Sequence, residues 1–169
     1  MHDKSIDKLI QGLNILIVDS NAYMRRITRM MLVNLGAKSV LEASDGLSAL
    51  EAIRSCDPDV VFIDWDMPVL SGMEVMRIVR SPGVFPRPDI PVIMLTSRAN
   101  RPYVIEALRT GVHEFLVKPT SPKALRERLM ATMLKPRRML RMGDYYVPEP
   151  RAARDGGRAV PWTEASQES

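Results

Sequence analysis

Cysteine and histidine are scarce in this chain. Cys56 is the only cysteine, and His2 and His113 are the only histidines. Without a second cysteine there is no disulfide framework. With one cysteine and two histidines, a zinc site or a Cys–His nucleophile is disfavoured. The chemistry of this protein must therefore come from other side chains.

Long apolar runs are missing as well. No stretch approaches the roughly 20 apolar residues that a membrane helix needs. The N-terminal sequence MHDKSIDKLI also lacks the apolar core of a signal peptide. We therefore predict a cytoplasmic protein with no membrane span.

The excess of positive charge is small. The formal net charge is +4, and the one dense basic patch is KPRRMLR at 135–141. Such a patch could contact an acidic partner, a membrane surface or nucleic acid, but it is more often a solvated helix end. With 46% hydrophobic residues in 169 positions, the composition predicts one folded domain with an appendage.

Apolar strands and amphipathic helices alternate along most of the chain. Helical spacing and N-terminal caps such as Asp45 and Ser121 mark the helices. The predicted strands are 14–18, 39–43, 60–64, 91–96 and 113–117, and the predicted helices are 24–35, 45–55, 71–81, 101–111 and 121–134. Five buried strands, each followed by a helix, predict an α/β protein with a doubly wound parallel sheet.

The ends of the chain do not follow this pattern. Residues 1–12 form an N-terminal extension before the predicted domain at 13–134. Residues 135–169 contain four prolines and three glycines with no apolar period, which is typical of a linker or an irregular tail. Aromatic residues such as Trp162 would still allow part of this Pro/Arg-rich tail to dock.

Polar side chains follow four of the predicted strands. Asp19, Asp64, Thr96 and Lys118 each end a strand or come directly after one. The carboxyl ends of parallel strands lie at one edge of a sheet, where ligands bind in such folds. We therefore expect these four side chains to converge on one site.

These residue types fit phosphoryl transfer. A carboxylate at Asp64 can attack a phosphoryl group and carry it as an acyl phosphate. Magnesium prefers oxygen ligands, which Asp19, Asp64 and the backbone carbonyl of Asp66 would supply. Lys118 would contact the phosphate as a point charge, and Thr96 could donate its hydroxyl to a phosphate oxygen.

Several motifs occur in one order and at one set of spacings over about residues 13–134. They are ILIVDS, EASDGLSAL, VVFIDWDMPVLSGMEV, PVIMLTS and GVHEFLVKP. This ordered set resembles the receiver domain of bacterial two-component response regulators, of the single-domain type typified by the chemotaxis regulator. The resemblance implies a flavodoxin-like sheet in the strand order 2-1-3-4-5.

The resemblance also implies roles for individual residues. Asp64 would be the phosphoacceptor, charged by a histidine kinase or a histidine phosphotransfer protein. Thr96 would be the switch hydroxyl, and Phe115 the aromatic residue that changes rotamer with it. Lys118 would bind the phosphate, followed by a cis Pro119.

Two positions depart from the usual pattern of that family. A second acid commonly follows the first at the end of strand one and binds the metal directly, but this chain has Ser20 after Asp19. A serine oxygen can still coordinate, directly or through water, so Ser20 is a further candidate ligand and predicts weaker magnesium binding. Phe115 stands where tyrosine is frequent, which keeps the packing change and loses a hydroxyl contact.

The sequence therefore predicts a stand-alone receiver that signals through contact with an unknown downstream protein. It would not be an enzyme beyond self-catalysed phosphoryl transfer and slow autodephosphorylation. One alternative is a receiver-like adaptor that works without phosphorylation, and a more distant one is a phosphohydrolase of the haloacid-dehalogenase type. Specific DNA binding is not expected, because the length and the prolines of the tail argue against a winged-helix or helix-turn-helix output domain.

Overall fold

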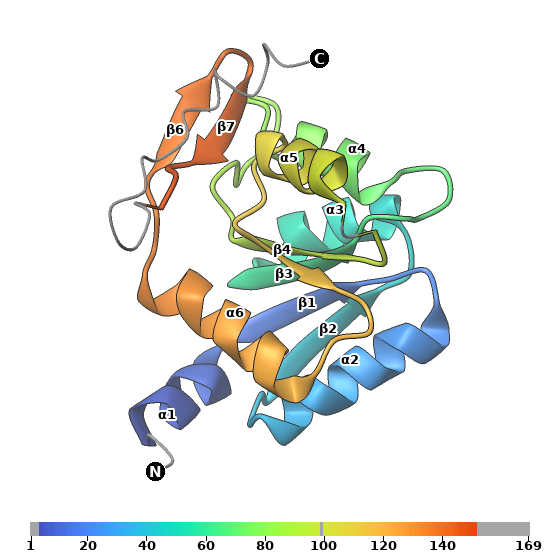
Figure 1. Cartoon of the computed structure of the whole chain (residues 1–169), viewed down its shortest axis with the longest axis vertical. Coiled ribbons are helices and arrows are strands. Elements are labelled where there is room, and N and C mark those ends of the chain that lie inside the picture. Colours follow the sequence, from blue (N-terminus) through green and yellow to red (C-terminus); the bar gives the residue numbers. More distant parts are fainter. Residues whose placement is uncertain (1–3, 99, 152–169) are drawn as a thin grey trace.

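Five parallel strands form the centre of the molecule (Figure 1). The computed structural model describes residues 4–98 and 100–151. The strands are β1 (Asn14–Val18), β2 (Ser39–Ala43), β3 (Val60–Asp64), β4 (Val92–Thr96) and β5 (Glu114–Val117). Their order in the sheet is β2-β1-β3-β4-β5, which confirms the predicted fold class and topology.

Helices cover both faces of this sheet. They are α1 (Lys4–Gly12), α2 (Ala22–Asn34), α3 (Gly46–Cys56), α4 (Gly72–Val79), α5 (Arg101–Arg109) and α6 (Pro122–Leu134). One hydrophobic core unites α3, α4 and α5 with the sheet, and a second unites α1, α2 and α6 with its other face. Strands β3 and β4 are buried along their whole length, as continuous apolar strands between two helical layers should be.

Side-chain caps start the helices that follow the strands. Asn21, Asp45, Ser71, Asn100 and Ser121 each accept a hydrogen bond from the backbone amide three residues later. These bonds satisfy amides that the first helical turn leaves without partners. Each strand therefore ends in a short loop that enters its helix at a fixed residue.

The N-terminal extension contains a helix that the sequence pattern did not predict. Helix α1 buries Ile10 completely in the core with α2 and α6. Ile6 and Leu9 of the same helix also pack against this core, on the side of the sheet where β1 begins. The extension is thus part of the fold. No helix within residues 4–98 and 100–151 is long and apolar enough to cross a membrane.

The expectation of an irregular tail is wrong over Met139–Pro148. Strands β6 (Met139–Met142) and β7 (Tyr145–Pro148) form an antiparallel hairpin whose turn contains Gly143 at φ +61°. Val147 is buried, and the Tyr146 amide donates to the Arg80 carbonyl oxygen at 3.0 Å. A Gly-Asp turn between two short apolar runs is a hairpin signal, which a search for helical periods overlooks. Trp162 lies outside the described residues.

The hairpin packs near an unusual buried arginine. Arg80 follows α4 and is completely buried, and its guanidinium donates to the carbonyl oxygens of Gly111 at 3.0 Å, Pro88 at 2.8 Å and Ile90 at 2.7 Å. It also lies 3.2 Å from Nδ1 of His113. Burial lowers the pKa of Arg80 to about 9 and, together with the Arg80 charge, lowers the pKa of His113 to about 2. By contacting Gly111, Pro88, Ile90 and His113, Arg80 holds together the loops at the amino ends of the strands.

Candidate phosphoacceptor site

Asp64 ends the most central strand and keeps a partly open carboxylate. Asp64 is 7% exposed, whereas the four residues before it in β3 are at most 1% exposed. The backbone beyond it is fixed by Gly72, whose amide donates to the Trp65 carbonyl oxygen at 2.9 Å. A Cβ at Gly72 would overlap the Asp64 carbonyl oxygen, so only glycine lets α4 start this close to the strand.

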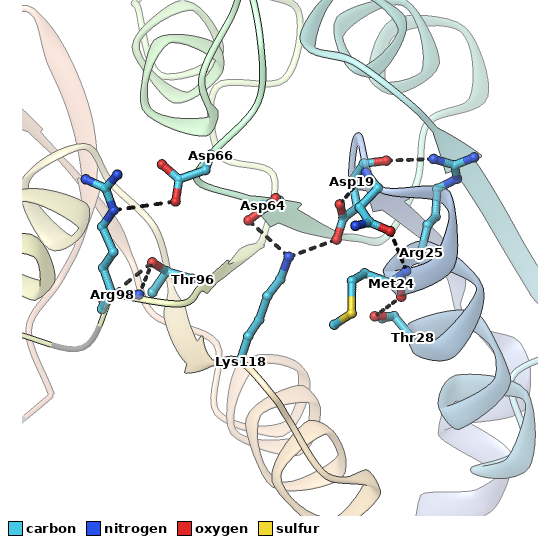
Figure 2. Close-up of polar contacts among 10 residues, drawn as sticks. Asp19, Met24, Arg25, Thr28, Asp64, Asp66, Thr96, Arg98 and Lys118 are labelled. Atoms are coloured by element: carbon cyan, nitrogen blue, oxygen red, sulfur yellow. Dashed lines mark hydrogen bonds and ion pairs between the residues drawn. The ribbon is translucent and has the colours of Figure 1, made fainter.

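Lys118 lies between two carboxylates, as Figure 2 shows. Its Nζ is 2.9 Å from Oδ2 of Asp19 and 3.2 Å from Oδ1 of Asp64. The Lys118–Pro119 peptide bond is cis. Burial alone disfavours the charge of Lys118, but the hydrogen bond to Asp19 and the charges of both carboxylates outweigh it and raise the lysine pKa.

Asp19 is the most enclosed of the three charged groups. Its side chain is 1% exposed, and its Oδ1 accepts the Asn21 amide at 2.9 Å. Its backbone carbonyl accepts a hydrogen bond from Arg25 at 2.7 Å. The carboxylate is thus oriented by the loop that starts α2, whereas the neighbouring Ser20 is exposed.

The pKa of Asp64 lies above the usual aspartate value. Removal from water is the main cause, the charge of Asp19 adds to it, and Lys118 and the Asp66 amide oppose it. A raised pKa means a more basic carboxylate, because the protein stabilises its negative charge less than water does. Such a group is better suited to attack phosphorus than a fully solvated aspartate.

Two carboxylates that share one ammonium also fit a metal cation. Asp19 and Asp64 direct oxygens at the same point, where the Lys118 charge now lies. Within residues 4–98 and 100–151, no three His, Cys, Asp or Glu side chains gather closely enough to hold a metal ion. The set must therefore be completed by neutral oxygens, for which the Asp66 carbonyl and Ser20 are the candidates predicted from sequence.

The Asp66 carboxylate is directed elsewhere. Its Oδ2 lies 3.6 Å from Nε of Arg98, and both side chains are about half exposed. Arg98 also stacks over the Tyr103 ring and donates to its hydroxyl at 2.7 Å. Tyr103 in turn meets Trp65 edge to face. These contacts join the loop after Asp64 to the loop after β4.

The Thr96 hydroxyl is held by the backbone of Arg98 (Figure 2). It accepts the Arg98 amide at 2.9 Å and donates to the Arg98 carbonyl oxygen at 3.4 Å. Thr96 itself is completely buried. Arg98 was not among the residues predicted from sequence, because an exposed arginine in a loop gives no signal until its partners are known.

Phe115 lies away from the three charged groups. It is half-buried on β5, beside Met94 of β4, and lines a groove of about 340 Å³ with Val104 and Leu108 of α5. The structure therefore brings Asp19, Asp64 and Lys118 together and leaves Phe115 on the edge strand. The functional roles of these residues stay predictions.

Fold and site together define a receiver. Residues 15–130 match the family of response regulator receiver domains, and the chain belongs to that family. Within it, the chain is similar to chemotaxis proteins. It is 39% identical to chemotaxis protein CheY1 of Helicobacter pylori over 118 residues, which are 69% of this chain and 94% of that protein. It is 38% identical to CheY-3 of Vibrio cholerae over 121 residues, or 72% and 92% of the two chains.

Solved structures agree with this assignment. Chemotaxis protein CheY4 of Vibrio cholerae superposes with a TM-score of 0.65 at 29% identity, covering 72% of this chain and 98% of that one. The receiver domain of a sensor histidine kinase from Pseudomonas aeruginosa superposes with a TM-score of 0.63 at 28% identity, covering 70% and 95%. That second structure holds a magnesium ion in its active-site cleft.

Proposed function

We propose that this receiver accepts a phosphoryl group on Asp64 and signals through contact with another protein. The observation that carries the proposal is the convergence of two carboxylates on Lys118 at the carboxyl end of the sheet. A carboxylate there is accessible, basic and adjacent to a fixed positive charge, which is what an acceptor of phosphoryl groups requires. The donor would be the phosphohistidine of a histidine kinase or a histidine phosphotransfer protein.

The transfer step uses groups that are already in place. An oxygen of Asp64 forms a bond to phosphorus while the bond from phosphorus to the histidine nitrogen breaks. The imidazole leaves with that electron pair, and a proton on its other ring nitrogen makes the released imidazole neutral. Lys118 then contacts a phosphoryl oxygen, and the Thr96 hydroxyl donates to another after leaving the Arg98 backbone.

Magnesium fits the same site. The carboxylates of Asp19 and Asp64 and the backbone carbonyl of Asp66 would hold it, with Ser20 as a further ligand. When bound, the ion supplies positive charge that offsets the charge of the phosphoryl oxygens. The magnesium in the related kinase receiver supports this ligand chemistry.

Signalling follows from the two positions available to Thr96. With its hydroxyl on the Arg98 backbone, the β4–α5 loop is in one arrangement; with the hydroxyl on a phosphoryl group, the loop and Phe115 would repack. A downstream protein that binds one arrangement better shifts the equilibrium towards it. The chemotaxis proteins among its relatives support such a role without naming the partner.

The test is phosphorylation in solution. The protein is incubated with acetyl phosphate, with and without magnesium, and its intact mass is measured. We expect a magnesium-dependent gain of one phosphoryl group that Asp64→Asn abolishes and Asp66→Asn retains. Absence of any gain at millimolar magnesium would refute the proposal and favour an adaptor that works without phosphorylation.

A further inference from the structure

The C-terminal segment does more than follow α6, because it returns to the domain beside the start of the edge strand β5. Arg137 donates a hydrogen bond to the His113 carbonyl oxygen, just before the strand begins. Arg151 donates to Oε1 of Glu114 at 2.9 and 3.2 Å and to the Ala131 carbonyl oxygen at 2.6 Å. Both ends of residues 137–151, which we call the strap, are thus anchored beside the amino end of β5, one at His113 and the other at Glu114.

The strap is also held in the middle by backbone contacts. The Tyr146 amide donates to Arg80, and a Cβ at Gly111 would lie 2.6 Å from the Tyr146 carbonyl oxygen. The Glu149 amide donates to the Arg138 carbonyl oxygen at 2.7 Å, which closes the strap on itself. The close approach at Gly111 shows that the hairpin is fitted to this surface.

The strap forms one wall of the groove that contains Phe115. Pro150 and Arg151 line this groove together with Val104 and Leu108 of α5. A protein that binds beside Phe115 must therefore meet the strap or displace it. The Glu114 carboxylate that anchors Arg151 belongs to the residue directly before Phe115 and is only 13% exposed.

The same strand connects the strap to the phosphoacceptor site. Strand β5 is an edge strand that pairs with β4 alone, with Phe115 beside Met94 and Val117 beside Thr96. Lys118 follows its last residue. A phosphoryl group on Asp64 would draw Thr96 and Lys118 towards it. Because Thr96 pairs with Val117 and Lys118 follows Val117, this movement would shift the carboxyl end of β5, while Arg151 holds Glu114 at the amino end.

We propose that the strap is an autoinhibitory element, released from β5 when Asp64 is phosphorylated. In the arrangement described, the Thr96 hydroxyl bonds the Arg98 backbone, Lys118 bonds Asp19 and Asp64, and the strap is seated. Because coupling between sites is reciprocal, loosening the strap should make the phosphorylated arrangement easier to reach. This inference rests on the proposed function.

The experiment measures the strap and the site separately. Amide exchange at Tyr146 and Glu149 reports the strap, and amide chemical shifts around Asp64 report binding of beryllofluoride with magnesium, a phosphoryl mimic. In the unaltered protein, beryllofluoride should speed exchange at Tyr146, whose amide bonds the domain at Arg80, and leave Glu149, whose amide bonds Arg138 within the strap, protected. Arg151→Gln should do the same without the mimic and should tighten beryllofluoride binding by about fivefold.

Two further variants keep the test decisive. Arg141→Gln is the matched control, because Arg141 is an exposed arginine of the hairpin whose side chain, among the described residues, bonds the turn carbonyl of Gly143. It should leave exchange and affinity unchanged. If Arg151→Gln unfolds the strap instead of releasing it, Glu149 loses its protection as well. Glu114→Gln then removes the ion pair with Arg151 intact, together with the longer pair between Glu114 and Arg128 at 3.7 Å.

The outcomes distinguish the two proposals. If beryllofluoride shifts the amides around Asp64 but leaves Tyr146 exchange unchanged, and the strap variants bind it like the unaltered protein, the strap is a passive brace and the inference is wrong. If no variant responds to beryllofluoride, the proposed function fails and the coupling fails with it.

Discussion

Lys118→Met should destabilise the fold through charge rather than packing. The change removes the ammonium between Asp19 and Asp64 and keeps a side chain of similar length. The side chains of those aspartates are 1% and 10% exposed, so water can replace the lost partner only in part. Removing one partner of a buried ion pair costs about 3 to 5 kcal/mol, and we expect the lower end here because Asp64 borders solvent.

The pH dependence of this loss has a definite sign. Lys118 lowers the pKa of Asp64, so its removal raises further a pKa that is already above the usual value. The folded state then binds a proton more tightly than the unfolded state does. The destabilisation is therefore largest at neutral pH, where the carboxylate is ionised, and shrinks as the pH falls through the raised pKa.

Urea unfolding of Lys118→Met and of the unaltered protein would measure this effect at about pH 7.5 and about pH 5.5, each with and without millimolar magnesium. Magnesium should restore stability in the variant by more than it stabilises the unaltered protein, since it no longer competes with the ammonium. Lys123→Met is the control, because the Lys123 side chain is 87% exposed. If Lys118→Met were as stable as the unaltered protein and neither responded to magnesium, Asp19 and Asp64 would not share a cation.

Two other sites give independent predictions. His113 stays neutral in the folded protein because its pKa is lowered to about 2, so stability is lost as the pH falls below the ordinary histidine pKa of 6.5. Between about pH 7.5 and pH 5 the free energy of unfolding should drop by about 2 kcal/mol. His113→Asn should flatten this pH dependence in urea titrations. Gly72→Ala should cost about 1 to 3 kcal/mol in thermal unfolding and slow phosphorylation of Asp64, because the methyl group displaces the Asp64 carbonyl. Gly12→Ala, at an open position, should do neither, and equal effects of the two glycine changes would contradict the steric reason.

The sheet could be predicted from sequence because its strands are apolar on both faces and its helices have strong caps. The predicted strand 60–64 agrees with β3, and 91–96 differs from β4 by one residue. The convergence of Asp19, Asp64 and Lys118 followed from their positions at strand ends, since parallel strands bring those ends to one edge. The strand order came from the family resemblance.

Other features depend on contacts between distant residues. Arg80 looks like any helix-terminal arginine, and only the folded chain brings Pro88, Gly111 and His113 around it. Likewise, the hydroxyl of Thr96 is held by the Arg98 backbone, a local choice that sequence spacing does not specify. The hairpin was missed because its stability comes from docking on the domain rather than from its own short strands.

The ion group at the phosphoacceptor site has a consequence for the incoming donor. Asp19, Asp64 and Lys118 carry a total charge of −1, and with an acid in place of Ser20 the total would be −2. A phosphoryl donor is itself an anion, so each additional carboxylate repels it as well as attracting a metal cation. If Asp64 accepts phosphoryl groups as proposed, Ser20 would weaken the attraction for magnesium and, by the same charge, lower the barrier to an anionic donor when magnesium is scarce.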